Sequence, residues 1–219
     1  MHPFCSRLRL QFLALGLAGL CLSSSAAVPS AVQVQRAEKI STALALAEPA
    51  RATRVRDIIA NQYADLSVIH AARDTAIQAA KQTAGTDKAA SEAAIKQARV
   101  DAEAAQDRLH PEYLARLAME LSPAQIEQVK DGMTYGVVPL TFRVYQEMLP
   151  NLTDEQKSQI LAWLTEAREH AMDASTSDEK HAWFGKYKGR INNYLAKAGI
   201  DMKQAEKDLQ ARKKARKDN

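Results

Sequence analysis

Residues 183–195 read WFGKYKGRINNYL, and the spacing of the large apolar side chains in this segment decides the fold class. These side chains recur every three or four residues: Trp183, Phe184, Tyr187, Ile191, Tyr194 and Leu195. Such a period places them on one face of an α-helix, whereas a strand would alternate every second residue. Similar apolar stripes begin at Val55 and at Ile160. No apolar run of strand length has a period of two, so the sequence predicts an all-α fold.

The ends of the helices are indicated by proline, glycine and capping residues. A long helix beginning at Pro49 is expected to end before a turn at residues 83–87 (TAGTD), after which a second helix follows. Pro111 is expected to interrupt this second helix, because proline lacks the amide that bonds one turn back. Gly199 and Asp201 are expected to end one helix and to begin the last. Capping boxes are predicted at three further helix starts: Ser122–Gln125, Thr153–Gln156 and Thr176–Glu179.

Alanines and aromatic residues occupy different parts of the chain. Residues 71–107 hold fourteen alanines and only three larger aliphatic side chains. Alanine favours a helix but buries little area, so we expect a helical hairpin here that projects as an arm. Nine of the ten aromatic residues after residue 27 lie from Tyr113 to Tyr194. The core is therefore expected in the C-terminal half of the chain.

The first 27 residues have the layout of a secretory signal peptide. Two arginines precede an eleven-residue apolar run (FLALGLAGLCL), and small residues then lead to a cleavage site near Ala27. A membrane-spanning helix needs about 20 apolar residues, so this run is too short for an anchor. Lipid attachment at Cys21 is disfavoured, because Leu20 precedes it where a small residue is required. We therefore expect a periplasmic or secreted protein.

Cleavage would remove both cysteines, Cys5 and Cys21. The exported chain would then have no disulfide, no thiolate metal site and no cysteine nucleophile. About 190 residues remain, which is enough to bury a core without disulfides.

The expected fold is an irregular multi-helix bundle in which a long alanine-rich hairpin precedes an aromatic-rich helical core. Its expected divisions are a signal peptide at 1–27, N-terminal helices with the hairpin at 28–110, the core domain at 111–201 and a basic C-terminal helix at 202–219.

The basic balance of the chain comes from its two ends. The full chain has a net charge of +4, and loss of Arg7 and Arg9 would lower it to +2. From Met202 onward, seven Lys/Arg and three Asp/Glu give +4, which leaves residues 28–201 at about −2. A basic tail suits an anionic lipid or an acidic polysaccharide, and a solvated helix end is the plain alternative. Because export separates the protein from cellular nucleic acids, no nucleic-acid partner is expected.

The aromatic segment also carries the candidate binding residues. Aromatic rings stack on the apolar faces of sugars, while amides and cations bind hydroxyl and carboxylate groups. Gly185 and Gly189 would permit the close approach of a ligand or of a second backbone. The alternative is an ordinary amphipathic helix, with its rings in the core and its charges in water. The candidate ligand-binding residues are Trp183, Tyr187, Lys186, Lys188, Arg190 and Asn193.

One short pattern occurs twice. Residues 121–125 (LSPAQ) and 152–156 (LTDEQ) both read L-[ST]-x-x-Q at a helix start. This pattern resembles the LTxxQ element of small periplasmic stress-response chaperones, which are helical and bind unfolded clients. A capping box explains both copies without any shared function. A chaperone or structural scaffold is therefore the second hypothesis for this chain.

The segment at residues 183–195 is also similar to part of a family of secreted bacterial proteins of unknown function. Further similar segments lie at residues 129–135 (VKDGMTY), 145–150 (YQEMLP) and 166–169 (EARE). The resemblance covers about residues 111–205, and the alanine-rich hairpin has no clear correspondence. It implies an envelope location and a role linked to polysaccharide use, because such genes lie among carbohydrate-active enzymes. It implies no catalytic residue.

No enzyme signature is present in the sequence. Glu166, His170 and Asp173 share a helical face and could ligate a metal, but solvated charged faces often produce such trios. The chain has no HExxH, no G-x-S-x-G, no phosphate-binding glycine loop and no dinucleotide fingerprint. We therefore expect a non-catalytic envelope binding or accessory protein without metal, cofactor or membrane span. Its partner would be a polysaccharide or another envelope protein. An enzyme of polysaccharide breakdown is the third hypothesis.

Overall fold

The computed structural model describes residues 27–83 and 87–217, and every regular element within them is an α-helix. The prediction of an all-α fold is confirmed. None of the helices in these two ranges combines the length and the apolarity that crossing a membrane requires. Residues 1–26 of the expected signal peptide, which include both cysteines, lie outside the described residues. The helices of the described part are α1 (Ala31–Ala43), α2 (Pro49–Thr83), α3 (Lys88–Ala118), α4 (Pro123–Met133), α5 (Val137–Met148), α6 (Asp154–Met172), α7 (Ser177–Lys197) and α8 (Met202–Lys217).

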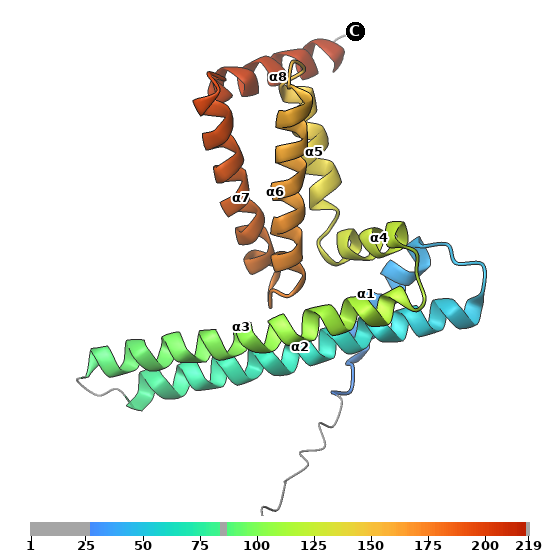
Figure 1. Ribbon diagram of the computed structural model, residues 1–219, viewed down its shortest axis with the longest axis vertical. Coiled ribbons are helices and arrows are strands. Elements are labelled where there is room, and N and C mark those ends of the chain that lie inside the picture. Colours follow the sequence, from blue (N-terminus) through green and yellow to red (C-terminus); the bar gives the residue numbers. More distant parts are fainter. Residues whose placement is uncertain (1–26, 84–86, 218–219) are drawn as a thin grey trace, which may run out of the picture.

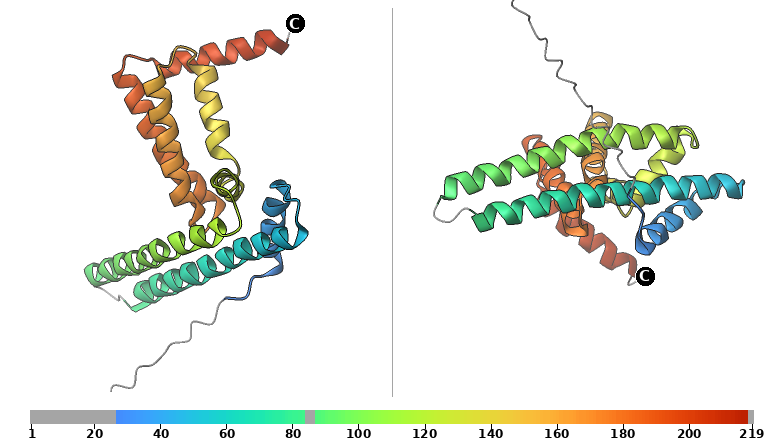
Figure 2. Two further views of the ribbon diagram at one scale, coloured as in Figure 1. Left: turned by 45° about the vertical axis from the view of Figure 1, so that its right-hand side comes forward. Right: turned by 90° about the horizontal axis from the view of Figure 1, so that it is seen from below.

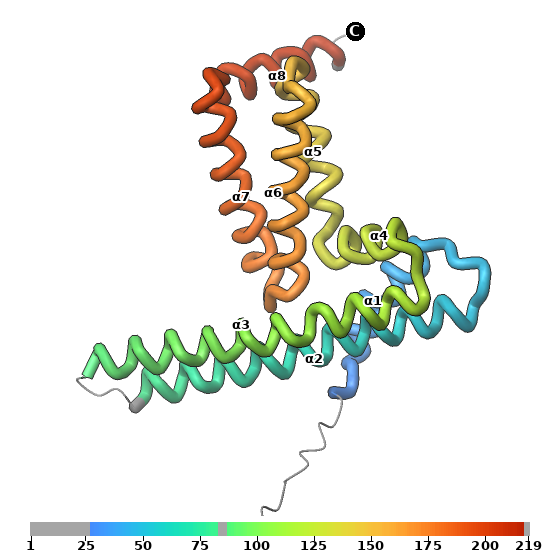
Figure 3. The backbone as a smooth tube through the Cα atoms, in the orientation of Figure 1, coloured from blue at the N-terminus to red at the C-terminus, as the bar shows by residue number. Residues whose placement is uncertain are grey.

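The helices form two units, which we call the N-terminal unit (α1–α4) and the C-terminal bundle (α5–α8). In the N-terminal unit, α2 and α3 run antiparallel along each other, and α1 packs on α2 (Figure 1). In the bundle, α5, α6 and α7 stand on one side of this hairpin, and α8 lies across their far end (Figure 2). Helix α4 leads from the hairpin into the bundle, as the backbone tube shows (Figure 3).

The alanine-rich part of the hairpin packs closely on itself. Ala80, Ala98 and Ala102 are buried where α2 and α3 meet, and the Ser91 hydroxyl donates to the Ala80 carbonyl at 3.2 Å. Val100, one of the few larger side chains here, is 46% exposed. The end of the hairpin lies beyond the bundle in both Figure 1 and Figure 2. This stretch therefore projects as an arm, as its composition predicts.

The expectation that Pro111 interrupts the second helix is wrong. Helix α3 continues through Pro111 to Ala118, and with it through the expected division between residues 110 and 111. A proline inside a helix costs about 3 kcal/mol through a lost hydrogen bond and a ring clash. Side chains next to it are held from outside the helix: Tyr113 is fully buried, and His110 bonds to α6. These tertiary contacts outweigh the local preference.

Two of the three predicted capping boxes are confirmed in full. The hydroxyls of Ser122 and Thr153 each accept from the amide three residues on, and the glutamine there accepts from the cap amide. At the third start, the Thr176 hydroxyl accepts from the Glu179 amide at 3.1 Å. The Glu179 carboxylate, however, accepts from the Ser175 amide at 2.8 Å rather than from the cap residue. The third box is therefore only half formed.

The last predicted helix boundary is also confirmed. Gly199 has a φ of +84°, in the left-handed region that other residues avoid, and follows the end of α7. The Asp201 carboxylate then accepts from the amides of Lys203 and Gln204, each at 3.0 Å, at the start of α8. A short turn thus reverses the chain between the two helices.

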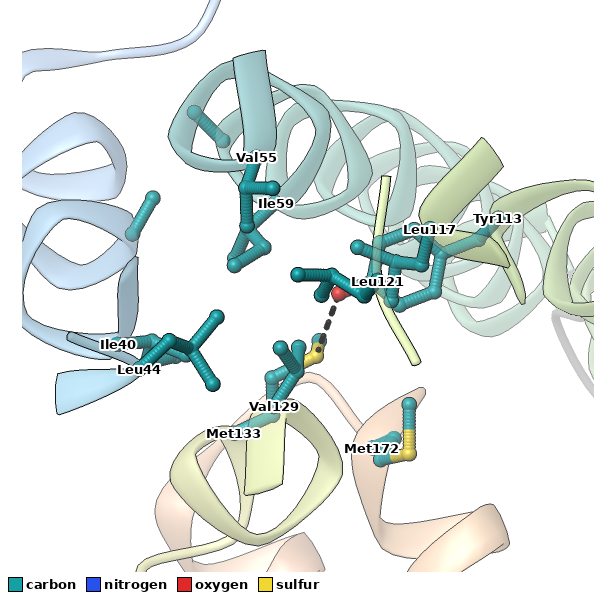
Figure 4. Close-up of a cluster of buried hydrophobic side chains, with 12 residues drawn as sticks. Ile40, Leu44, Val55, Ile59, Tyr113, Leu117, Leu121, Val129, Met133 and Met172 are labelled. Atoms are coloured by element: carbon teal, nitrogen blue, oxygen red, sulfur yellow. Dashed lines mark hydrogen bonds between the residues drawn. The ribbon is translucent and has the colours of Figure 1, made fainter. Parts of the chain in front are cut away.

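The core is not confined to the C-terminal half, as had been expected, because each unit has its own apolar cluster. In the N-terminal unit, Val55 and Ile59 of α2 face Tyr113 and Leu117 of α3, and the Tyr113 hydroxyl donates to Met133 Sδ at 3.2 Å (Figure 4). These residues precede or follow the alanine-rich arm, which explains how the hairpin is both an arm and part of a core. The C-terminal cluster contains Val138, Tyr145, Leu152, Ile160, Leu164, Ala167, Ala171, Phe184, Tyr187, Ile191 and Leu195.

Candidate functional site

The six candidate residues on α7 do not share one site. Lys186, Arg190 and Asn193 line a groove between α6 and α7. Trp183 is half-buried and lines a cavity between the two units of the molecule. Lys188 lies in a different groove, formed with α5 and α8. The structure therefore brings together only part of the set that the helical pattern suggested.

Tyr187, the sixth candidate, belongs to the core of the bundle. It is 5% exposed, and its hydroxyl donates to the Glu166 carboxylate at 2.8 Å. Burial, with a smaller contribution from this bond, raises the pKa of Tyr187 to about 12. The Glu166 carboxylate also lies 3.6 Å from the guanidinium of Arg190. Tyr187 thus packs in the core and does not offer a face to a ligand.

The groove between α6 and α7, here called the α6–α7 groove, has a volume of about 540 Å³. The Trp163 and Tyr194 rings meet edge to face with centres 5.3 Å apart. The guanidinium carbon of Arg190 lies 4.6 Å from the centre of the Trp163 ring, a cation–π contact. The lining residues are Trp163, Lys186, Gly189, Arg190, Asn193, Tyr194 and Lys197.

Trp163 is the main residue of this groove that sequence reasoning missed. It lies on α6, whereas the candidate set was drawn from the periodicity of α7 alone. The signal that would have found it is the matching stripe at Ile160, once α6 is paired with α7. Lys197 was also left out, although it continues the same face of α7 one turn beyond Asn193.

The α6–α7 groove is basic. Three cations and no carboxylate line it. Within the described ranges, Lys186 and Lys197 have no carboxylate within salt-bridge distance, and Arg190 has only Glu166 at 3.6 Å. Because these side chains are exposed, water solvates their charge and they need no internal partner. They are free to bind an anionic ligand.

The two glycines of α7 have no packing role within the described chain. A Cβ built on Gly185 or on Gly189 would meet no atom within 4 Å. The close approach of a second backbone, one of the two expected reasons for these glycines, is therefore absent from the described residues. Gly189 lines the α6–α7 groove and keeps a methyl group out of it. A glycine inside a helix costs about 0.5–1 kcal/mol relative to alanine.

A second space, here called the inter-unit cavity, lies between the hairpin and the bundle and has a volume of about 600 Å³. Trp183 stacks on His170, with ring centres 4.4 Å apart and planes 15° apart. The Lys186 ammonium lies 4.7 Å from the centre of the same Trp183 ring. The lining residues are His70, Arg73, Glu103, Gln106, Asp107, His170, Asp173, Ala174, Glu179, Ala182, Trp183 and Lys186.

Next to this cavity, an imidazole connects the hairpin to α6. His110 Nδ1 lies 2.7 Å from a carboxylate oxygen of Asp173, and its Nε2 lies 3.3 Å from Glu169. Hydrogen bonds to these two carboxylates raise the pKa of His110 to about 9. Burial alone would raise the pKa of Glu169, but the bonds to His110 and Lys130 outweigh it and lower that pKa to about 2. The contact is therefore an ion pair at neutral pH.

Two buried cations extend this connection to α4. Arg168 is 3% exposed and bonds to Glu127, to Asp131 at 2.7 Å and to Glu169 at 3.4 Å. The Lys130 ammonium lies 2.9 Å from Glu169 and 3.3 Å from Glu127. A buried cation is tolerated only when carboxylates neutralise it, and here they do. We call the set the inter-unit ion network: His110, Glu127, Lys130, Asp131, Arg168, Glu169 and Asp173.

The C-terminal end of α6 is capped by side chains from other helices. The buried Lys180 ammonium donates to two of its last carbonyls, at 2.8 and 3.0 Å. The Asp173 carbonyl accepts from His70 Nε2 and from Gln106, both at 2.9 Å. The last carbonyls of a helix lack partners within it and carry partial negative charge, so donors here stabilise it. Burial lowers the pKa of Lys180 to about 8.

The three residues considered as metal ligands in the sequence, Glu166, His170 and Asp173, each contact another side chain. Glu166 accepts from Tyr187, His170 stacks on Trp183, and Asp173 pairs with His110. Among residues 27–83 and 87–217, no three His, Cys, Asp or Glu side chains are placed to hold a metal ion.

In its described part this chain is an all-helical protein of two units, with an exposed aromatic and basic groove on the second. A family model described as "Protein of unknown function (DUF3826)" matches residues 30–215, so the chain belongs to that family. The match extends beyond residues 111–205 and includes the alanine-rich hairpin. A comparison with curated proteins found no match.

Proposed function

We propose that this protein is an exported, non-catalytic binding protein that holds an acidic oligosaccharide in the α6–α7 groove. The observation that carries the proposal is that two rings, Trp163 and Tyr194, lie in one groove with cations that the described chain leaves largely unpaired. Export rests on the signal-peptide layout of the first 27 residues.

The groove has the chemistry that a uronate-containing ligand needs. The guanidinium of Arg190 offers a fork of donors suited to a carboxylate, and Lys186 and Lys197 add two further cations. Half-buried rings provide apolar surface for the carbon face of a sugar, and Asn193 can bond hydroxyl groups. Gly189 leaves room for the ligand to approach the helix. A neutral polymer would leave the cations without a partner.

The same lining argues against catalysis in this groove. Hydrolysis of a glycosidic bond ordinarily uses two carboxylic side chains across the scissile bond. The lining contains no carboxylate and no histidine, so no side chain there can serve as general acid and base near neutral pH. The groove can bind a sugar chain but lacks the groups to cleave it.

The chaperone hypothesis gains no support from the repeated L-[ST]-x-x-Q pattern. Its two leucines, Leu121 and Leu152, are 6% and 5% exposed, so neither is available to an unfolded client. Both copies are complete capping boxes. Local helix formation accounts for the pattern.

Isothermal titration calorimetry with tetragalacturonate and with neutral cellotetraose tests the proposal. We expect binding of the uronate only, and weaker binding at higher salt, because exposed charges are screened. Titrations in which the folded protein binds no acidic oligosaccharide at low salt would overturn the proposal.

Substitutions locate the binding in the groove. Arg190→Ala and Lys197→Ala should each raise the Kd for tetragalacturonate by about tenfold, a loss of about 1.4 kcal/mol. Lys157→Ala is the control, because Lys157 is a partly exposed cation of α6 that pairs with Asp154 at 3.1 Å and lies outside the groove. Its Kd should stay within a factor of about two. Equal effects of all three changes would mean non-specific attraction by net charge.

A further inference from the structure

The inter-unit cavity and the α6–α7 groove are neighbours along α7. Lys186 lines both of them. Trp183, Lys186, Arg190 and Lys197 are three, four and seven residues apart, so they lie along one side of the helix. At a rise of 1.5 Å per residue, the strip from residue 183 to residue 197 is about 21 Å long. A ligand in the groove can therefore continue past Lys186 into the cavity.

The hairpin wall of the cavity carries two carboxylates without a cation. Glu103 and Asp107 are exposed, and neither forms an ion pair with any residue in the described ranges. They are one turn apart on α3, where like charges repel and weaken the helix slightly. The pair therefore does nothing for the stability of α3, and it leaves several oxygen acceptors facing the cavity.

Two further acceptor atoms without a partner in the described chain belong to residues of the cavity lining. His70 is 5% exposed, and its Nε2 must carry the hydrogen because the Asp173 carbonyl that it contacts can only accept. Burial lowers the pKa of His70, so the ring is neutral and its Nδ1 has a free lone pair. Neither His70 Nδ1 nor the Oδ1 atom of Asp173 has a hydrogen-bond partner in the described chain. Both residues line the cavity, but these two atoms are themselves buried and are not open to a ligand there.

One cation that is unpaired in the described chain faces the two carboxylates of the hairpin wall. Arg73 already pairs with Asp74 at 2.8 Å and with Glu179 at 3.6 Å. The lining then offers one unpaired cation, the ammonium of Lys186 at the edge shared with the groove, and the N–H groups of Gln106, His170 and Trp183. The cavity thus differs from the groove in its unpaired charge: two carboxylates without a cation in the described chain line the cavity, whereas no carboxylate lines the groove.

We infer that the inter-unit cavity receives a neutral sugar unit, whose hydroxyl groups donate to Glu103 and Asp107, while uronate units of the same ligand occupy the α6–α7 groove. A uronate in the cavity would face unpaired carboxylates and be repelled. The ligand is therefore an oligosaccharide that mixes uronate and neutral units. This inference rests on the proposed function, because it assigns the substrate class of the same binding region.

Calorimetry on the full chain with two tetrasaccharides tests the inference. One is tetragalacturonate, which has only uronate units, and the other is a hyaluronan tetrasaccharide, in which uronate and neutral units alternate. We expect the alternating ligand to bind at least about tenfold more tightly. In the double variant Glu103→Gln with Asp107→Asn, this preference should fall to within about twofold, because amides no longer repel a uronate.

Glu112→Gln is the matched control, since Glu112 is an exposed carboxylate of α3 that does not line the cavity. It should keep the preference of the unmodified chain. Equal affinity of the unmodified chain for both ligands, or an unchanged preference in the double variant, would overturn the inference while the groove proposal stood. Absence of binding to either ligand would overturn both. Circular dichroism checks that each variant is folded.

Discussion

Two sets of cations, one where α4 meets α6 and one along α7, differ in what they contact. Arg168 and Lys130 of the inter-unit ion network are buried, and each bonds to at least two carboxylates. Lys186 and Lys197 of the α6–α7 groove are exposed and unpaired within the described chain, and Arg190 there has one distant partner. A buried charge must be neutralised by the protein, whereas an exposed one is solvated. The first set therefore holds the two units together, and the second is available to a ligand.

The largest expected effect comes from removing the buried member of the first set. Arg168→Met leaves Asp131 without its cation and removes one of the cations that contact Glu127 and Glu169. Hydrogen bonds to charged groups are worth about 1.5–3 kcal/mol each, and Arg168 makes three, so we expect a net loss of about 3–5 kcal/mol. Urea unfolding followed by circular dichroism should show this loss in the free energy of unfolding. The Kd of the folded variant for tetragalacturonate should not change.

Arg143→Met provides the control for this prediction. Arg143 is an exposed arginine of α5, 4.0 Å from Glu147 one turn on, so its pair contributes little. Its loss should change the free energy of unfolding by at most about 0.5 kcal/mol. Equal costs for the two substitutions would show that the inter-unit ion network does not stabilise the fold.

The next effect is a pH dependence from the same network. The folded protein raises the pKa of His110 from 6.5 to about 9, so it binds the proton more tightly than the unfolded chain does. This contribution to stability is complete below pH 6.5 and is lost as the pH rises through 9. At about 1.4 kcal/mol per pKa unit, it amounts to at most about 3.5 kcal/mol. The difference in the free energy of unfolding between the unmodified chain and His110→Gln, measured by urea unfolding, should shrink by this amount as the pH rises from below 6.5 to above 9.

The quantity to measure is the difference in the free energy of unfolding between the unmodified chain and His110→Gln. Lys180 makes the stability of each protein alone depend on pH in the opposite direction. Its pKa is lowered to about 8 in the folded state, so it adds stability as the pH rises from there toward 10.5. Both proteins contain Lys180, and its contribution cancels in the difference. A difference that stays constant from pH 6.5 to pH 9 would contradict the ion pair of His110 with Asp173 and Glu169.

The comparison of the two sets also shows which features a sequence reveals. The capping boxes at Ser122 and Thr153 are predictable, because a segment of four residues contains all the partners. The helices are predictable for the same reason, since each apolar stripe repeats within one turn. Pro111 shows the limit of such local rules: the burial of Tyr113 and the bond from His110 hold α3 together against the preference of the proline.

The candidate site was harder to predict than the fold, because it depends on which helices meet. The partners Glu127 and Asp131 are 41 and 37 residues from Arg168 in the sequence, so the sequence alone did not mark Arg168 as a structural cation. Trp163 comes to the α6–α7 groove from another helix. Tyr187 and Trp183 belong to the same apolar stripe of α7. Packing against α6 nevertheless buries Tyr187 almost completely and leaves Trp183 half-buried. Periodicity shows a face of a helix but not what covers it.

A smaller effect tests the assignment of Tyr187 to the core. Tyr187→Phe removes the buried hydroxyl that donates to Glu166, which should cost about 1 kcal/mol of stability. Tyr145→Phe is the matched control, because it removes the bond from another buried hydroxyl, to Asn192 at 2.7 Å. Both variants should lose similar stability in thermal unfolding and bind tetragalacturonate within about twofold of the unmodified chain. A much larger loss of affinity in Tyr187→Phe alone would return Tyr187 to the binding site.

The smallest change in stability separates structure from function most directly. Gly185 and Gly189 are helical glycines, and a Cβ added to either would meet no other atom within 4 Å. Gly185→Ala and Gly189→Ala should therefore each raise the free energy of unfolding by about 0.5–1 kcal/mol. Only Gly189 lines the α6–α7 groove, where the added methyl group meets a bound ligand. We therefore expect thermal unfolding to show the same gain for both variants and calorimetry to show weaker tetragalacturonate binding for Gly189→Ala alone. If Gly189→Ala gains stability and keeps full affinity, the ligand does not approach α7 at this point, and the groove proposal loses its geometric basis.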